Sequence, residues 1–344
     1  MKRLLIVRMS ALGDVVHALP VLAAIRDARP EIDVDWLADR HYAGILEYVD
    51  GIAQVVIGRP GLSNAVAVMR RREYDVAIDL QGLLKSAAMA RLSAATRVVG
   101  FDRNGLREPA AAWFYNETAA VPAGAHVIDK NLAVLAALQI PRPTMPRFPF
   151  VIPKSLVADD VRSAAAKRGL GHIALINPGA AWPNKRWPPE RFGAVARHLS
   201  EHHRFAPVVL WGRGEMPLAD AVVTASASTA VRAPETTIGD LLGLAAGASL
   251  MVSGDTGPLH IAAAVGTPIV GLYGPTWPER NGPWRPADVV VSRAAECECH
   301  HMRRCRRDAG RGDGDSLMCL NDVSVRDVID AVDRRVAASN RIAT

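Results

Sequence analysis

Four polar segments directly follow short apolar runs, and they contain the side chains best suited to chemistry. The first, residues 10–14, reads Ser-Ala-Leu-Gly-Asp and follows the run 4–7. The Asp14 carboxylate lies where a helix is expected to begin, so it can cap that helix or act as a general base. The position alone leaves both roles open.

Two further segments carry charged groups that could contact a nucleotide. Residues 177–188 contain Lys185 and Arg186 between two tryptophans, after an apolar run. A cation there can neutralise a diphosphate without a metal, although a solvated surface loop has the same composition. Residues 211–215 end in Glu215. Its carboxylate can accept two hydrogen bonds from a ribose, or it can remain a loop acid without a partner.

The fourth segment, residues 253–268, begins Ser-Gly-Asp-Thr-Gly-Pro and predicts a strand end, a turn of small residues and a helix. Backbone amides at a helix start, together with the helix dipole, form an anion site. Gly257 allows a phosphate to approach the backbone, and Pro258 suits the first helical turn, where its missing N–H costs nothing. Asp255 or Thr256 could instead simply cap this helix.

Apolar runs of strand length alternate with longer helical patterns along the chain. This alternation predicts parallel sheets covered by helices on both faces. The predicted strands are residues 4–7, 33–37, 55–57, 75–80, 96–100, 173–176, 207–210, 249–253 and 268–273. The predicted helices are residues 15–27, 85–92, 128–138, 189–200, 238–246, 258–265 and 325–337.

Residues 140–149 separate the two halves of this pattern. Four of these ten residues are proline, which removes amide donors and disfavours helix at the preceding position. We therefore predict a linker between two doubly wound α/β domains, residues 1–150 and 151–344. Such sheets bind ligands at the carboxyl ends of their strands, so we expect a site in a cleft between the domains. The G-x-G-x-x-G fingerprint of dinucleotide-binding domains is missing after the first strand.

Composition and charge exclude several classes of protein. The chain has 344 residues, of which 49% are hydrophobic and 22% charged, as in ordinary globular proteins. Its net charge of +6 permits an anionic partner, but no nucleic-acid-binding motif accompanies it. No apolar stretch approaches the ~18 residues needed to cross a bilayer, and Arg8 interrupts the apolar start before a signal peptide can form. We therefore expect a cytoplasmic protein.

Together these motifs resemble the ADP-heptose:lipopolysaccharide heptosyltransferases, which form glycosyltransferase family 9. The resemblance covers nearly the whole chain, with the motifs in the same order. They are Gly13-Asp14, residues 185–188, residues 254–260 and residues 273–276. Two more segments, residues 78–87 and 107–116, resemble the heptosyltransferase I branch.

The resemblance implies a GT-B fold, in which two Rossmann-like domains face each other across a cleft. The N-terminal domain would bind the acceptor and the C-terminal domain the nucleotide sugar. The resemblance also implies that Asp14 is the general base and that Lys185 both binds the donor and assists catalysis. The other implied donor contacts are Glu215, Asp255, Thr256, Gly257 and His260. The implied acceptor contacts are Arg8, Gly13 and Arg59.

The implied reaction is an inverting, metal-independent transfer of L-glycero-D-manno-heptose from ADP-heptose to Kdo of the lipopolysaccharide inner core, without a cofactor. A Kdo-lipid A type acceptor would make the enzyme a peripheral protein at the inner face of the inner membrane. Three alternatives stay open: a heptosyltransferase II-like enzyme, another nucleotide-sugar transferase of this family, and a non-catalytic sugar- or nucleotide-binding protein.

Several segments depart from the family pattern. Ala180-Ala181 stand where heptosyltransferase I has two threonines, so hydroxyl contacts to the phosphates would be lost. The basic insertion expected after the third strand is shortened to residues 58–61, which leaves Arg59 or the arginines at 70–72 as candidate substitutes. Three consecutive arginines are also typical of a solvated helix face.

The C-terminal part holds the four cysteines of the chain. Their spacing is not that of paired C-x-x-C motifs, so it favours a structural role over a metal site or a disulfide. The segment contains Cys297, Cys299, Cys305 and Cys319, together with His300 and His301.

The final predicted helix, residues 325–337, could pack back on the N-terminal domain.

Overall fold

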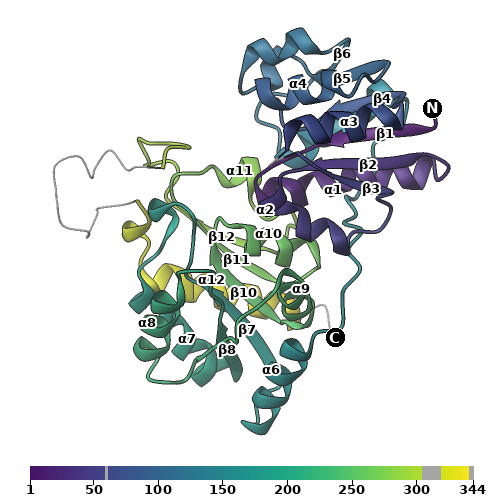
Figure 1. The fold of residues 1–344 in the computed structure, drawn as a ribbon. Coiled ribbons are helices and arrows are strands. Elements are labelled where there is room, and N and C mark those ends of the chain that lie inside the picture. The colour runs from purple at the N-terminus through teal and green to yellow at the C-terminus, as the bar shows by residue number, and fades with distance from the viewer. Residues whose placement is uncertain (59–60, 304–318, 341–344) are drawn as a thin grey trace. The chain divides into compact units, whose positions relative to one another are not determined.

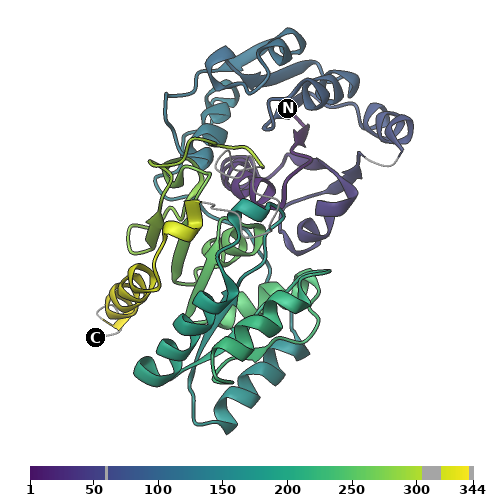
Figure 2. The same ribbon diagram turned by 90° about the vertical axis from the view of Figure 1, so that its left-hand side faces the viewer.

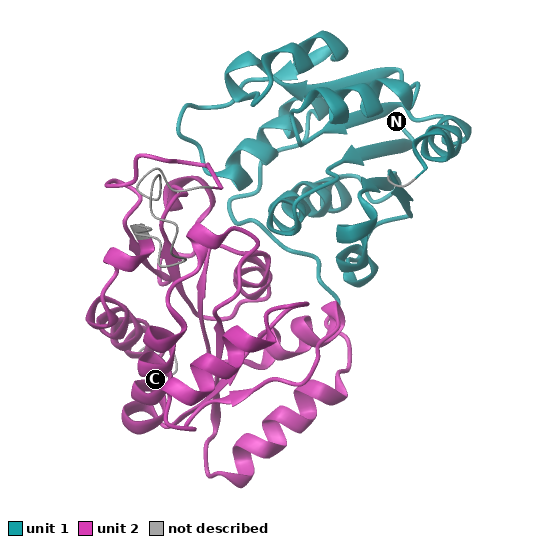
Figure 3. Cartoon of the chain, turned by 60° about the vertical axis from the view of Figure 1, so that its left-hand side comes forward, with its two compact units in different colours: residues 1–151 teal, residues 152–344 magenta. Residues whose placement is uncertain are grey.

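The chain forms two compact units, Met1–Val151 and Ile152–Thr344 (Figure 3). The structure is a computed structural model, and it describes residues 1–58, 61–303 and 319–340. The division lies one residue from the boundary expected from the sequence. The proline-rich segment ends inside the first unit, where the Pro149 carbonyl accepts a hydrogen bond from the Asp50 amide at 2.9 Å. Phe150 also pairs with Val49 in an isolated bridge.

The first unit is built on a parallel sheet with the strand order β3-β2-β1-β4-β5-β6. Its central strand β1 pairs with β2 and β4, so that Val7 lies beside both Leu37 and Asp79. The carboxyl ends of these strands therefore meet at one edge. The strands are β1 (Arg3–Val7), β2 (Asp33–Ala38), β3 (Gln54–Ile57), β4 (Val76–Asp79), β5 (Arg97–Phe101) and β6 (Glu117–Ala119).

Helices cover this sheet because their apolar residues are buried against it. Met69 of α3 and Met89 of α4 join one buried cluster with Leu5 and Val7 of β1. Helix α1 is buried from Val15 to Ile25 and contacts α5. The helices are α1 (Leu12–Ala28), α2 (Arg40–Ala43), α3 (Leu62–Arg72), α4 (Leu84–Leu92) and α5 (Val127–Leu132), with 3-10 turns η1 (Gly44–Tyr48), η2 (Arg103–Gly105), η3 (Pro109–Phe114) and η4 (Ala133–Leu138).

The second unit contains a parallel sheet of the order β12-β11-β10-β7-β8-β9. Ser253 of β10 pairs with Asn177 of β7, so the loops that follow these two strands start side by side. The strands are β7 (His172–Asn177), β8 (Phe205–Val209), β9 (Val231–Arg232), β10 (Leu250–Gly254), β11 (Ile269–Tyr273) and β12 (Val289–Ser292). The helices are α6 (Leu156–Lys167), α7 (Pro189–His203), α8 (Met216–Ala225), α9 (Ile238–Gly247), α10 (Gly257–Ala264), α11 (Pro278–Asn281) and α12 (Val325–Asn340), with 3-10 turns η5 (Pro183–Lys185) and η7 (Cys319–Asp322).

Helix α12 completes the core of the second unit. Its residues Val328, Ala331 and Val332 are fully buried in the same cluster as Trp187, and α12 contacts β11, β12 and α7. The helix, yellow in Figures 1 and 2, can be followed along this sheet. The sequence left open a packing of this helix on the N-terminal domain; the buried residues of α12 named above lie in the core of the second unit.

Some elements differ from the sequence prediction for physical reasons. The expected helix 128–138 divides into α5 and a 3-10 turn at Ala133–Leu138. Helix α3 escaped prediction because it has only two buried residues, Ala65 and Met69, beside its run of arginines. Helices α6 and α8 were also missed, as were the short strands β6, β9 and β12.

The three arginines at the end of α3 have separate roles. Arg72 forms an ion pair with the fully buried Asp35, with Nε 2.8 Å from Oδ2. The hydroxyl of Tyr74 donates to the same oxygen at 2.7 Å. Arg70 donates to the Leu92 carbonyl at 3.2 Å, whereas Arg71 is exposed. The prediction of a fully solvated helix face is therefore wrong for Arg72, which balances a buried charge.

We expect Arg72→Ala to lower the free energy of unfolding by about 3–5 kcal/mol, because it leaves the Asp35 carboxylate buried without its countercharge. The matched control is Arg71→Ala, which removes the neighbouring exposed guanidinium and should change stability by less than about 0.5 kcal/mol. Urea unfolding followed by circular dichroism measures both. Equal effects of the two substitutions would show that Arg72 has no structural role.

Candidate active site

The first unit places Asp14 in the first turn of α1, directly after the carboxyl end of β1. Its Oδ1 lies 2.7 Å from Nη2 of Arg8, and its Oδ2 accepts the Ala11 amide at 3.2 Å. The Asp14 side chain is 36% exposed, whereas that of Arg8 is 8% exposed. The carboxylate thus closes the start of the helix and remains open to solvent, so the two roles left open by the sequence are compatible.

Arg8 is held by the strands around it. Its Nη1 donates to the carbonyl of Leu80, which follows β4. Its Nε is buried without a hydrogen-bond partner in the described part of the chain. Because both terminal nitrogens act within the unit, Arg8 fixes the position of Asp14. Gly13, also expected near the acceptor, lies beside Asp14 in the first turn of α1 and is partly buried.

Gln81 supports the same loop, and the sequence did not single it out. Its Oε1 accepts the Met9 amide at 2.9 Å, and its Nε2 lies 3.4 Å from the Ser10 hydroxyl. The backbone N–H of Gln81 donates to Oδ1 of Asp79 at 2.8 Å. Burial raises the pKa of Asp79, although hydrogen bonds from Tyr115 and others oppose the shift. The quoted motif at residues 78–87 was the signal that could have identified Gln81.

The second unit gathers its polar residues around the Asp255 carboxylate, which is 5% exposed. Oδ2 lies 2.5 Å from Nζ of Lys185 and accepts the Thr276 hydroxyl at 2.8 Å. Oδ1 lies 3.0 Å from Nε2 of His260 and accepts the Asn281 amide at 2.8 Å. Asp255 therefore has four partners, two from the segments after β7 and β11 and two from helices α10 and α11. The sequence indicated Lys185, His260 and Thr276 but gave no signal for Asn281.

Two opposing effects act on Asp255. Burial alone would raise its pKa, because the charged form loses hydration. The hydrogen bond from His260 and the positive charge of Lys185 outweigh burial and hold the pKa far below the usual range. The carboxylate is therefore ionised at neutral pH and keeps the ammonium group of Lys185 in place.

Lys185 lies in a loop that is fixed from several sides. Its ammonium group is 4.8 Å from the ring centre of Trp182, which favours a cation. The carbonyl of Lys185 approaches Gly254 so closely that a Cβ there would lie 2.7 Å from it. Trp187, which is fully buried, donates from Nε1 to the Val323 carbonyl at 3.0 Å. The loop therefore has a defined position on the unit.

Asn177 joins the loops that follow β7 and β10. Its Nδ2 lies within 3.1 Å of the Gly179 carbonyl and of the hydroxyls of Ser253 and Thr256. Thr256 is the N-cap residue of α10, yet its side chain makes no capping hydrogen bond to this helix start. The capping role considered for Asp255 and Thr256 is thus not used. Gly257, the first residue of α10, presents its amide at this uncapped end.

Glu215 lies against the same group of loops. Its Oε2 accepts the Gly212 amide at 3.0 Å, and its Oε1 lies 3.8 Å from Nη2 of Arg186. A Cβ at Gly179 would lie 2.2 Å from Oε2, so a larger residue there would displace the Glu215 carboxylate. The carboxylate is therefore oriented by its neighbours and is 21% exposed.

The sequence of this chain is similar to those of known glycosyltransferases. The family model described as glycosyltransferase family 9 (heptosyltransferase) matches residues 66–309, which is more than half of the chain. The chain belongs to glycosyltransferase family 9. Its two six-stranded parallel α/β units are those of a GT-B glycosyltransferase, as expected from the sequence.

Individual relatives agree with this assignment. Lipopolysaccharide heptosyltransferase 1 of Pseudomonas aeruginosa is 30% identical over 86% of this chain and 85% of its own length. The protein of the same name from Escherichia coli K12 is 28% identical, over 80% and 89%. The structure of E. coli heptosyltransferase WaaC with ADP has a TM-score of 0.73 at 23% identity, covering 97% of this chain and 99% of that one.

The fold likeness extends to more than one branch of family 9. E. coli ADP-heptose lps heptosyltransferase II superposes with a TM-score of 0.74 at 18% identity, covering 99% of this chain and all of that one. Fold similarity alone therefore does not separate the branches. The sequence relatives at 25–30% identity that carry the name heptosyltransferase 1 favour the first branch.

Some residues that the sequence analysis singled out in this glycosyltransferase have other partners than expected, and some lie outside the residues that the structure describes. Arg59 falls outside the described residues, as does Cys305. At Ala180, where the resemblance implied a hydroxyl, the backbone carbonyl accepts a hydrogen bond from Nε of Arg186 at 2.9 Å. Cys297 and Cys299 are buried, with their Sγ atoms 3.5 Å apart. Cys319 is described only as the first residue of η7.

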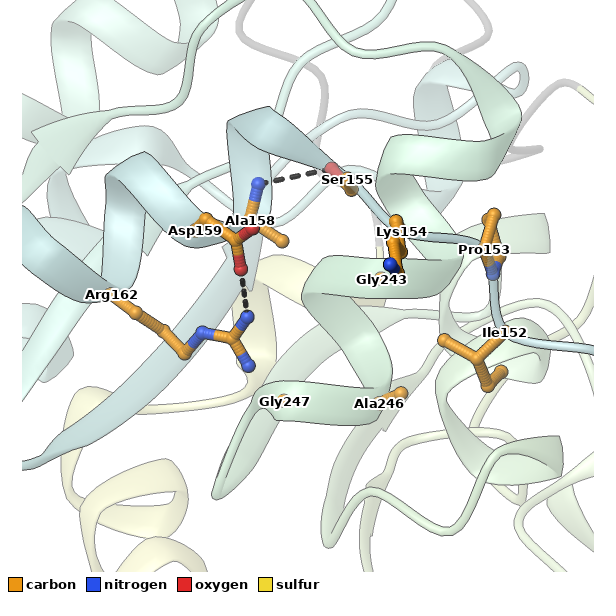
Figure 4. Close-up of a pocket in the computed structure, with 10 residues that line it drawn as sticks. All are labelled: Ile152, Pro153, Lys154, Ser155, Ala158, Asp159, Arg162, Gly243, Ala246 and Gly247. Carbon is orange, nitrogen blue, oxygen red and sulfur yellow. Dashed lines mark hydrogen bonds and ion pairs between the residues drawn. The ribbon is translucent and has the colours of Figure 1, made fainter.

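A hollow of about 310 Å³ lies elsewhere on the second unit (Figure 4). It is formed by α6, α9 and the segment before α6, and the ion pair between Arg162 and Asp159 lies at its rim. None of the site residues expected from the sequence lines it. Its lining residues are Ile152, Pro153, Lys154, Ser155, Ala158, Asp159, Arg162, Gly243, Ala246 and Gly247.

We expect Asp255→Asn to lower the free energy of unfolding by about 3–5 kcal/mol at neutral pH, because Lys185 loses its buried countercharge. The folded-state pKa of Asp255 lies below its unfolded value of about 3.9. The charge of Asp255 therefore contributes its full stabilisation of the folded state at pH values above the unfolded-state pKa. This stabilisation decreases as the pH falls below that pKa. The difference between the wild type and the variant should shrink below about pH 4.

Chemical unfolding at pH 7 and at pH 3 measures this difference. The matched control is Asp220→Asn, which breaks an exposed ion pair with Arg232. The Asp220 side chain is 54% exposed. Such surface pairs contribute at most about 1 kcal/mol. If Asp255→Asn lost the same free energy of unfolding at both pH values, this result would contradict the buried-charge explanation.

Proposed function

We propose that this enzyme transfers L-glycero-D-manno-heptose from ADP-heptose to Kdo of a Kdo-lipid A acceptor, with inversion at the anomeric carbon. The observation that carries the proposal is the Lys185 ammonium held 2.5 Å from Asp255 beside the uncapped start of α10. A fixed cation next to helix amides suits a diphosphate. The relatives named heptosyltransferase 1 and the structure of WaaC with an ADP-heptose analogue support the choice of donor.

In this proposal Asp14 is the general base. The acceptor hydroxyl attacks the anomeric carbon of the donor, its proton passes to the Asp14 carboxylate, and the bond from that carbon to the diphosphate oxygen breaks. Arg8 acts as a positioning residue, since its buried guanidinium holds Asp14 at 2.7 Å. Acceptor recognition then depends on other groups, including Gly13 and Arg59.

The leaving ADP gains negative charge as the bond breaks. Lys185 and the amides at Thr256 and Gly257 stabilise that charge, and they need little reorganisation because the surrounding loops already fix them. Asp255 and His260 act mainly by orienting Lys185 and the loops around it. Glu215, fixed against Gly179, is placed to accept hydrogen bonds from the donor ribose. The scheme needs neither a metal nor a cofactor.

Asp14→Asn should retain ADP-heptose binding but lose roughly 10²–10⁴ in turnover, since the variant cannot take the proton. A coupled assay of ADP release with Kdo-lipid A measures turnover, and calorimetric titration measures donor binding. Asp27→Asn is the matched control because Asp27 lies on the same helix and is 62% exposed. Near-normal turnover of Asp14→Asn would remove Asp14 from the role of base.

The same assay discriminates among the possible functions. Wild-type enzyme is offered ADP-heptose and other nucleotide sugars, each with Kdo-lipid A and with an acceptor that already carries one heptose. Release of ADP only with the second acceptor would indicate a heptosyltransferase II-like activity. Binding of ADP-heptose without release on either acceptor would indicate a non-catalytic binding protein.

Helix α4 and turn η3 form a surface suited to a membrane. Trp113 is 77% exposed and Leu84 is 43% exposed, and the two elements pack together, with the Leu84 amide donating to Glu108 at 2.7 Å. Lys85 and Arg107 are exposed nearby in the sequence. Tryptophan favours the membrane interface, and basic residues are attracted to anionic lipids. Within the described residues, no helix is long and apolar enough to cross a bilayer.

We therefore propose peripheral attachment of the first unit to the inner face of the inner membrane, where the lipid acceptor is found. Trp113→Ala should reduce co-sedimentation with vesicles that contain anionic lipid by several-fold, because it removes the largest exposed apolar side chain. Leu156→Ala, which removes an 82% exposed leucine of the second unit, is the control. Unchanged binding of Trp113→Ala, or binding that is insensitive to salt, would contradict this attachment.

A further inference from the structure

Three side chains that the transferase scheme does not use converge between α7 and α12. Nε2 of His198 lies 2.8 Å from Oδ1 of Asp333, and Nε2 of His203 lies 2.7 Å from the same oxygen. The two histidines belong to α7 and the aspartate to α12. They are all partly exposed, with 17%, 22% and 45% of their side-chain surface accessible, respectively. The cluster is thus open to solvent on one side.

A third imidazole lies beside this cluster. The ring of His202, four residues after His198 on the same helix, is 4.6 Å from that of His198. The rings of His198 and His203 are 5.3 Å apart and nearly perpendicular. Histidines on one helix face therefore meet a carboxylate from a second helix. An ordinary ion pair needs one imidazole, whereas this arrangement brings two to a single oxygen.

We propose that His198, His203 and Asp333 form a binding site for a divalent transition-metal ion of the zinc type. Two imidazole nitrogens and a carboxylate oxygen are typical ligands of Zn²⁺, and the remaining position can hold a water molecule. The three ligand atoms lie within 4.8 Å of one another. Hard cations such as Mg²⁺ prefer oxygen ligands, so the two nitrogens select against them.

To admit the ion, the two nitrogens must move away from Oδ1 and reach a similar distance from each other, starting from a separation of at most 4.8 Å. Tetrahedral ligands at ~2.0–2.1 Å from zinc are about 3.3 Å apart, so the nitrogens must move away from Oδ1 by roughly half an ångström. The hydrogen that each Nε2 now shares with Asp333 must also leave that nitrogen, because metal ligands bind through their unprotonated atoms. A neutral imidazole achieves this by carrying its proton on Nδ1 instead.

The proposed ion has a structural role and lies outside the transferase site. It joins α7 to α12, two helices that already share a buried cluster around Trp187. Asp333 follows His203 by 130 positions in the chain, so the ion would link distant segments of the second unit. A ligand that binds only the folded state stabilises that state. We expect the ion to raise the resistance of this unit to unfolding.

Zinc chloride titrated into the EDTA-treated full-length protein tests the site. We expect one Zn²⁺ per chain with a dissociation constant in the micromolar range or tighter, and no comparable binding of Mg²⁺. His203→Gln and Asp333→Asn should each weaken zinc binding at least tenfold. His41→Ala, which removes an exposed histidine of the first unit, should leave it unchanged.

Two further measurements separate this site from the cysteines and from misfolding. Co²⁺ bound at His198, His203 and Asp333 should give visible d–d bands without thiolate-to-metal charge-transfer absorption. At a hundredfold excess over its dissociation constant, zinc should raise the melting temperature by roughly 5–10 °C, and this shift should be lost in Asp333→Asn. In EDTA, the variants should melt close to the wild type.

The opposite results would overturn the proposal. These are zinc binding that is absent or equal in the wild type and both variants, or a Co²⁺ spectrum that shows thiolate ligation alone. In either case the cluster is a hydrogen-bonded contact between two helices and nothing more.

Discussion

The second unit depends on one constraint, the ionised carboxylate of Asp255 buried beside the ends of its central strands. A buried charge is tolerated only where ionic and hydrogen-bonding partners replace water. Here those partners come from the loops after β7 and β11 and from helices α10 and α11. The adjacent order β11-β10-β7 brings these segments within reach. The geometry that solves the problem of the buried charge also fixes the groups proposed to bind the donor.

The same principle appears in the first unit, where the buried member of the ion pair is the positive charge instead of the negative one. There the buried member of the pair is the guanidinium of Arg8, and the exposed member is the carboxylate of Asp14. In the second unit the buried member is the carboxylate, and the partly exposed member is the ammonium of Lys185. Each unit therefore presents one charge to solvent and holds its partner inside. In the proposed scheme, the negative charge belongs to the general base Asp14 and the positive charge to Lys185, which would hold the diphosphate.

The sequence predicted the central strands and the four polar loops because local information suffices for them. Buried parallel strands are continuous apolar runs, and glycine with small polar residues marks the loops that follow. The edge strands β6 and β9 were missed since they have only three and two residues. The partners of Asp255 were only partly predictable. Asn281 lies 26 residues away at the end of α11, and no local pattern indicates that its side-chain amide turns toward the carboxylate.

The packing of α12 has a consequence for how the polypeptide reaches its native state during synthesis. The first unit ends at Val151, so everything it needs to fold is translated early. The core of the second unit includes Val328, Ala331 and Val332, which are among the last described residues to be made. Until they emerge, the apolar faces of β11, β12 and α7 lack a cover. The first unit can therefore fold while the chain is still being made, whereas the second unit keeps apolar surface exposed until α12 is complete, and such surface is prone to aggregation.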